Sequence, residues 1–258
     1  MSATTPLITS WSQNKSNRCN FEEILTYWES YDVLTFLVDL GVYHPSFHSV
    51  LNDREKEQEY GLKTDYFKKR FTVSRCITKF ILQSILKTEE ISDIDLSKKI
   101  NKRIVVKNRE DIYISISYSC SSIAISIGKR KIGSDIEAFR PVCIKKIRSF
   151  PLFNIMHNKS EKERIPTFLH IWTMIEAYAK FYDKNPFPYL NCVILPKDAH
   201  FISYCINQCS IFSLAFSQQP MKDIVLWIDP ESIETIHSGI NNANSSSLSS
   251  TNNKYHRA

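Results

Sequence analysis

The chain has 258 residues, which is enough to bury a full core as one domain or as two smaller ones. Its content of 43% hydrophobic and 23% charged residues is ordinary for a soluble globular protein. The net charge of +6 suits an anionic partner, and the five glycines include neither a P-loop nor a dinucleotide-binding fingerprint.

The termini and the cysteines indicate where such a protein would work. The N-terminus lacks the apolar core of a signal peptide, and no run approaches the ~20 apolar residues of a membrane span. The seven cysteines are odd in number and form no C-x-x-C pair, which argues against a disulfide framework or a zinc module. We therefore expect a cytoplasmic protein without a membrane partner, whose cysteines mostly fill the core.

The N-terminal half is predicted to contain short strands and one long helix. Residues 1–20 are polar and expected to be loose, residues 21–30 suit a short helix, and residues 33–40 suit a strand. Asn52 or Asp53 is placed to cap the next helix. Residues 66–86 carry apolar side chains at helical spacing, and Lys69 and Arg70 lie near the start of this long amphipathic helix.

Several strands follow. A basic segment at residues 98–107 contains Lys102 and a short strand, and residues 112–119, which include Ser117 and Tyr118, alternate as a strand does. Residues 123–127 form an apolar strand that ends in a basic turn at 129–131. Near the C-terminus, residues 193–195, 201–206, 211–216 and 224–228 also suit strands. The tail from residue 237 is polar and of low complexity, so we expect it to be disordered.

The first motif that carries chemistry is Gly133-Ser134-Asp135-Ile136-Glu137. Residues two apart in a strand point to the same face, so Asp135 and Glu137 would lie together. Two neighbouring carboxylates suit a hard divalent cation such as Mg²⁺. The alternative is an ordinary solvated strand edge, because D-x-E pairs are common.

The second motif lies in residues 167–183, whose apolar positions recur at helical spacing. Trp172, Glu176 and Lys180 follow each other at intervals of four and therefore share a face. Charges on a largely buried helix need a partner or a metal. The alternative is an exposed ion pair between Glu176 and Lys180.

Together the two motifs resemble the paired signature of the 4′-phosphopantetheinyl transferases, G-x-D-[IV]-E followed by W-[ST]-x-K-E-A-x-x-K. The larger, Sfp-type members are the most similar, and the resemblance covers roughly residues 33 to 230. It implies an α/β (α+β) fold with two pseudo-symmetric subdomains, each a small sheet packed on a long helix. We expect a loose segment at 1–20, subdomains at 21–130 and 131–236, with the metal motifs in the second, and a disordered tail at 237–258.

The resemblance also implies a reaction and its site. A holo-acyl-carrier-protein synthase of this type transfers the phosphopantetheine arm of coenzyme A to a serine of an apo acyl or peptidyl carrier protein and releases 3′,5′-ADP. The implied Mg²⁺ ligands are Asp135, Glu137 and Glu176. Glu176 would also accept the serine proton, and Lys180 would stabilise the pyrophosphate. The implied residues for coenzyme A are Arg70, Lys69, Lys102, Ser117 and Tyr118.

Two replacements depart from the family pattern: one removes a cation, and the other exchanges a residue that can become a cation for one that can only form hydrogen bonds. Ile175 stands where the family has lysine, and Tyr118 stands where the Sfp-type members have histidine. The alternative to a working enzyme is therefore a binding protein that holds coenzyme A or a carrier protein without transfer. We do not expect a nucleic-acid partner, because the aromatic residues lie mostly in apolar stripes. The basic residues Lys145, Lys146 and Arg148 suit either a docking edge for the acidic carrier or an exposed helix face. The family's two-domain members imply a monomer.

Overall fold

The computed structural model describes residues 8–11, 17–98, 103–142, 150–192, 198–217 and 221–233. Its α-helices are α1 (Ile24–Ser30), α2 (Asp53–Tyr60), α3 (Asp65–Leu86) and α5 (Glu161–Tyr182). Its strands are β1 (Ile8–Trp11), β2 (Val33–Asp39), β3 (Leu96–Lys98), β4 (Ile104–Val106), β5 (Tyr113–Ser119), β6 (Ser122–Gly128), β7 (Ile132–Ala138), β8 (His200–Ile206), β9 (Ser210–Phe216) and β10 (Asp223–Ile228). Short 3₁₀ helices include η4 (Pro45–Val50), η6 (Pro151–Asn158) and η7 (Phe187–Asn191). The expected mixed α/β class is confirmed.

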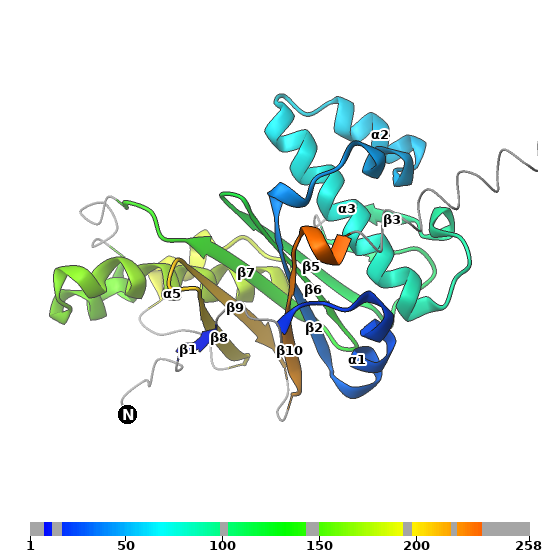
Figure 1. Cartoon of the computed structure of the whole chain (residues 1–258). Helices are drawn as coiled ribbons and strands as arrows, with labels where there is room; N and C mark the ends of the chain where they lie inside the picture. The colour runs from blue at the N-terminus through cyan, green and yellow to red at the C-terminus, as the bar shows by residue number, and fades with distance from the viewer. Residues whose placement is uncertain are drawn as a thin grey trace, which may run out of the picture.

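The same order of elements occurs twice along the chain. A strand, a long helix and a hairpin follow each other as β2-α3-β5-β6 and again as β7-α5-β8-β9. Each hairpin pairs back antiparallel onto the strand before the helix, and a distant strand adds in parallel at one edge. The resulting sheets have the orders β10-β2-β6-β5 and β1-β8-β9-β7, and β3 and β4 form a separate hairpin. Figure 1 shows the two larger sheets beside each other, with α5 along the second.

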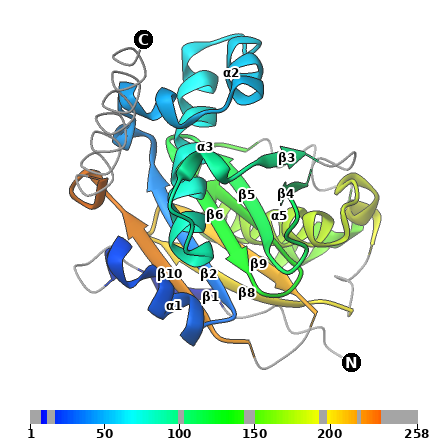
Figure 2. The same cartoon turned by 90° about the vertical axis from the view of Figure 1, so that its right-hand side faces the viewer.

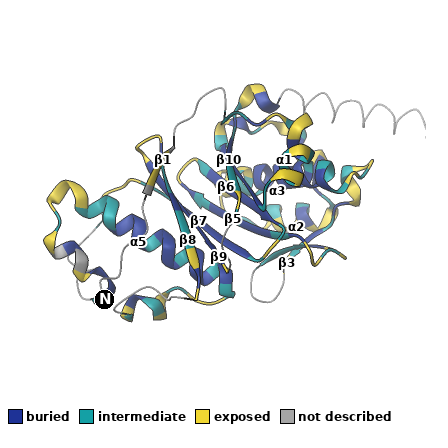
Figure 3. Ribbon diagram, turned by 90° about the horizontal axis from the view of Figure 1, so that it is seen from below, coloured by how far each residue is buried: buried dark blue, intermediate teal, exposed yellow. Residues whose placement is uncertain are grey.

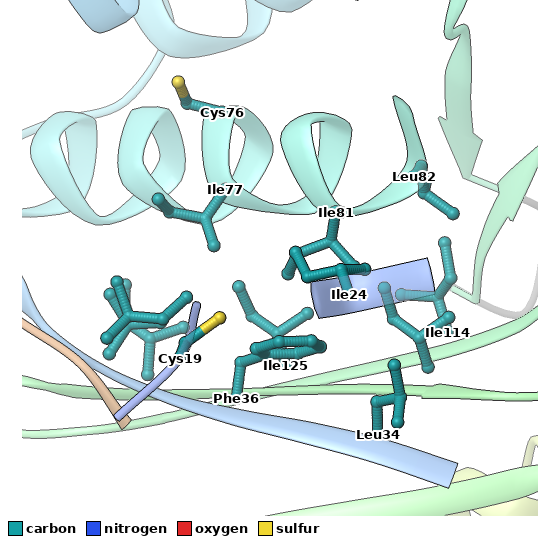
Figure 4. Close-up of a cluster of buried hydrophobic side chains, with 14 of the residues drawn as sticks. Cys19, Ile24, Leu34, Phe36, Cys76, Ile77, Ile81, Leu82, Ile114 and Ile125 are labelled. Carbon is teal, nitrogen blue, oxygen red and sulfur yellow. The ribbon is translucent and has the colours of Figure 1, made fainter. Parts of the chain in front are cut away.

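Apolar side chains on both faces of the sheets explain this arrangement. Leu34 and Phe36 of β2 point into a cluster with α3, whereas Val33 and Leu37 point into a second cluster shared with β7 and β9. Figure 2 shows α3 across the first sheet, and Figure 4 shows the side chains of α3 above those of β2, β5 and β6. Figure 3 shows that the strands are mostly buried, while the exposed residues gather at helix ends and turns. Strands buried on both faces read as nearly continuous apolar runs, as β2 and β6 do.

Local signals set the helix starts. Asn52, one of the two expected caps, begins α2: it accepts a hydrogen bond from the backbone of Glu55, and the Glu55 side chain accepts one from the backbone of Asn52, which makes a capping box. The helix α5 begins at Glu161, earlier than the predicted 167. The reason is a second such pair, in which the Glu163 carboxylate accepts from the Ser160 backbone N–H, 3.0 Å away.

The N-terminal segment and the division of the chain differ from expectation. β1 lies inside the segment that was expected to be loose, and it pairs in parallel with β8. Cys19 is buried in the core. β10 belongs to the later half of the chain but pairs with β2, so each larger sheet takes an edge strand from the other half of the chain. A single boundary near residue 130 therefore does not separate the two sheets. The expected strand at 193–195 and the tail at 237–258 lie outside the described residues.

The cysteines and the helices bear on two further expectations. Among the described cysteines, Cys19 and Cys76 are buried, whereas Cys120 and Cys209 are exposed and Cys192 and Cys205 are partly buried. The expectation that the cysteines mostly fill the core is therefore wrong for the described residues. The six cysteines within the described ranges are all free thiols. No helix in the same ranges combines the length and apolar character that a membrane span requires.

Candidate active site

The site is built on β7. Asp135 and Glu137 lie on one face of this strand, toward α5, while Ile132 and Ile136 point into the cluster between the sheets. Asp135 is buried, and the side chain of Glu137 is 16% exposed. The predicted pairing of the two carboxylates on one strand face therefore agrees with the strand assignment.

Gly133 allows α5 to approach this strand closely. A Cβ atom on Gly133 would lie 2.1 Å from the carbonyl oxygen of Ala177 and 2.3 Å from the backbone nitrogen of Phe181. Both atoms belong to the helix backbone and cannot rotate away. The glycine of the first motif is thus needed for packing, because it brings the second motif within reach of Asp135.

The helix α5 presents Trp172, Glu176 and Lys180 on one half-buried face, as their spacing predicts. The Nζ atom of Lys180 donates to Oδ1 of Asp135 at 2.8 Å and to the carbonyl oxygen of Ser134 at 3.0 Å. Burial raises the pKa of the Glu176 carboxyl, and the nearby charge of Asp135 raises it further, while Lys180 opposes the shift. Residues 45 positions apart in sequence are therefore in direct contact.

Three serines of β5 connect the two sheets. Ser115, Ser117 and Ser119 all lie on the face of β5 that meets β7 and are all buried. Their hydroxyl oxygens accept hydrogen bonds from backbone N–H groups of β7 at Ser134, Ile136 and Ala138, over 2.9, 3.2 and 2.8 Å respectively. Hydroxyl groups satisfy backbone donors that no neighbouring strand of the same sheet can reach.

Two of these serines also contact the acidic pair. Ser117 donates to Oδ1 of Asp135 at 2.7 Å, and Ser119 donates to Oε2 of Glu137 at 3.0 Å. Arg140 approaches both oxygens of Glu137, at 3.3 and 3.4 Å. Ser117 was expected to bind the cofactor. The structure places it under the carboxylates. The alternation of serine along β5 indicates that the three serines share a face, but not that this face meets the acids.

The residue types around Asp135 suit a divalent cation. Oδ2 of Asp135 is buried without a hydrogen-bond partner, and Glu176 has a raised pKa beside two other acids. Carboxylate oxygens are the kind of ligand that Mg²⁺ prefers. Within the described ranges, however, no three His, Cys, Asp or Glu side chains converge closely enough to hold a metal. In this arrangement the Lys180 ammonium is the cation that contacts Asp135.

Two cavities meet at Glu176. The larger, of about 590 Å³, is lined by Lys180 and by two further cations, Arg103 and Lys184. The smaller, of about 300 Å³, has mainly apolar and aromatic walls, among them Trp172, and it also reaches Glu137. Glu176 lines both, so it stands between a cavity rich in cations and an apolar one.

The expected cofactor residues on α3 lie on the other face of β5. The guanidinium of Arg70 lies 4.2 Å from the ring centroid of Tyr118, whose hydroxyl donates to Ser74 at 2.9 Å. Lys69 is exposed, with its Nζ 5.3 Å from the ring centroid of Tyr43. Arg70 and Tyr118 are thus brought together, and Ser117 next to Tyr118 points the opposite way, toward Asp135.

A buried ion cluster beneath α2 was not expected from the sequence. Glu55 contacts Lys79 at 2.6 Å and Arg75 at 3.9 Å, and all three side chains are at most 3% exposed. Lys79 also donates to the carbonyl oxygen of Val50 at 3.1 Å. Burial lowers the pKa of Arg75. Two of the positively charged residues of α3, Arg75 and Lys79, therefore lie inside the protein.

Two further residues of α5 are buried. Ile175, which stands where the family has lysine, is fully buried in an apolar cluster with Phe153 and Leu169. His170 is 3% exposed, and its Nε2 has no partner. Burial lowers the pKa of His170 from 6.5 to about 4. Lys102, Lys145, Lys146 and Arg148 lie outside the described residues.

Comparison with known proteins assigns no family. No protein-family model matches the chain, and no curated protein matches it significantly. Any function must therefore be argued from the site itself.

Proposed function

We propose that this protein is a divergent, Mg²⁺-dependent phosphopantetheinyl transferase with the two-subdomain fold of the Sfp-type members. The observation that carries the proposal is the 2.8 Å contact between Lys180 and Asp135. It joins the two sequence motifs on which the family resemblance rests. The repeated order of strand, long helix and hairpin is what two pseudo-symmetric subdomains require.

Asp135, Glu137 and Glu176 would be the metal ligands, with the unpartnered Oδ2 of Asp135 as one ligand atom. Because the three carboxylates do not form a three-ligand group in this structure, they would have to draw closer together to hold the ion. When bound, Mg²⁺ would neutralise charge on the pyrophosphate of coenzyme A. Phosphoryl transfer depends mainly on positioning and on such neutralisation. Arg103, Lys180 and Lys184 line the larger cavity and would bind phosphate oxygens there.

Glu176 is the proposed proton acceptor. A carboxylate within reach of a substrate hydroxyl can act as a general base. Glu176 lies between the two cavities, so it would meet a serine hydroxyl that enters from the apolar side while the phosphates occupy the cationic side. The absence of a lysine at position 175 would leave Lys180 as the cation that this helix contributes.

The test is transfer of the arm to a panel of apo acyl and peptidyl carrier proteins, followed by intact-mass analysis. We expect one phosphopantetheine on at least one carrier, and its loss with EDTA or with Asp135→Ala. Asp111→Ala is the matched control, because Asp111 is an exposed acid paired with Arg109 and lies outside the site. Binding of coenzyme A without transfer to any carrier would instead support a binding protein. If the protein neither binds coenzyme A nor transfers its arm to any carrier, the proposal is refuted.

A further inference from the structure

We propose that Ser117 and Ser119 are positioning residues whose hydroxyls orient the carboxylates of Asp135 and Glu137 toward a divalent cation. The inference rests on the proposed function, since it concerns the same acids. It adds two residues, from the opposite sheet, to the parts that make the site.

Each hydroxyl has its orientation set by a pair of hydrogen bonds. Ser117 accepts from the backbone N–H of Ile136 and donates to Oδ1 of Asp135. Ser119 accepts from the backbone N–H of Ala138 and donates to Glu137. A serine hydroxyl has a single proton to donate. Because its oxygen already faces a backbone donor, that proton is directed at the carboxylate.

The result at Asp135 is an asymmetric carboxylate. Oδ1 accepts from both Ser117 and Lys180, at 2.7 and 2.8 Å. Oδ2 is buried and has no partner. A carboxylate held by one oxygen presents the other in a fixed direction, which is how partners behind metal ligands usually act. Glu137 is more exposed and also bonds Arg140, so its orientation depends less on its serine.

Ser115 provides an internal control for this argument. It is buried on the same face of β5 and accepts from the backbone N–H of Ser134 at 2.9 Å. It forms no hydrogen bond to a carboxylate; its other contact is the Ser134 carbonyl, 3.4 Å away. Removing the hydroxyl of Ser115 therefore removes one of the three connections between β5 and β7, and it removes no hydrogen bond to either acid.

The experiment measures Mn²⁺ binding to the full-length protein by isothermal titration calorimetry, with Ser115→Ala, Ser117→Ala and Ser119→Ala compared. Urea unfolding of each variant measures the structural cost that all three share. We expect Ser117→Ala to weaken Mn²⁺ binding about 10- to 100-fold. Ser119→Ala should weaken it less, and Ser115→Ala should leave it within about twofold at a similar loss of stability.

A variant that keeps the shape of the side chain guards against loss of folding. Ser117→Cys is close in size but carries only a weak donor, so it should also weaken Mn²⁺ binding if the hydroxyl orients Asp135. In the transfer reaction, both Ser117 variants should lower kcat more than they change KM for coenzyme A.

Two results would overturn the inference, and they are distinguishable. If the wild type binds Mn²⁺ and the Ser117 and Ser115 variants bind it equally well, the serines have no positioning role, while the proposed function stands. If the wild type binds neither Mn²⁺ nor coenzyme A, the proposed function fails together with the inference.

Discussion

Replacing Gly133 by alanine tests the packing on which the site depends. The new Cβ would lie 2.1 Å from a carbonyl oxygen of α5, whereas real contacts essentially never fall below 3.0 Å. The helix would have to move by at least 0.9 Å, or β7 would have to bend. Overpacking of this kind costs about 1–3 kcal/mol. A displacement near 1 Å would also weaken the Lys180–Asp135 contact, and such misplacement can reduce activity by about 100-fold.

Urea unfolding would measure the stability of the variant, and transfer to a carrier protein would measure its activity. The matched control is Gly61→Ala at the end of α2. Gly61 has a helical backbone, and its added Cβ would meet the nearest atoms at an ordinary 3.6 Å. The control should keep wild-type stability or gain up to about 1 kcal/mol. A Gly133→Ala protein as stable and as active as the wild type would refute the idea that close approach of α5 positions the site.

Two further predictions concern buried ionisable side chains. Lys79→Met leaves Glu55 buried without its 2.6 Å partner and should lower the free energy of unfolding in urea by about 3–5 kcal/mol. The control Lys56→Met, in an exposed pair, should lower it by less than ~0.5 kcal/mol. Equal losses in the two variants would contradict the stabilising role of the buried ion pair. For His170, the folded protein resists protonation down to about pH 4, while the unfolded chain binds a proton near pH 6.5. Acid therefore favours unfolding, and this residue should remove up to ~3 kcal/mol of stability between those two pH values. In His170→Gln, the free energy of unfolding should not show this loss between pH 6.5 and pH 4. If the variant loses as much stability as the wild type over that range, His170 is not the cause.

Much of the local structure could be predicted from residue patterns. The apolar periodicity of residues 66–86 and 167–183 indicated the two long helices, and the alternation in residues 112–119 indicated β5. The capping box at Asn52 and the shared face of Trp172, Glu176 and Lys180 follow from spacing alone. These features depend on neighbours within a few residues, and such neighbours are visible in the sequence.

Other features of the site could not be predicted in this way. The role of Ser117 required knowing that β5 lies against β7, and β5 and β7 belong to different sheets. The internal position of Lys79 required the packing of α2 on α3, since a basic residue on an amphipathic helix usually faces solvent. The place of β10 beside β2 depends on a contact between opposite ends of the chain.

The sequence by itself determined most of the helices and strands, although not β1 or the start of α5, and it determined which of their side chains share a face. It also placed Asp135 and Glu137 together, because a strand alternates its side chains every residue. Only the tertiary structure decided that Lys180 contacts Asp135, that serines from the other sheet hold both acids, and that one carboxylate oxygen is left without a partner. The physical reason is that periodicity acts within one element, whereas these contacts arise where separate elements pack, and packing is set by the whole core.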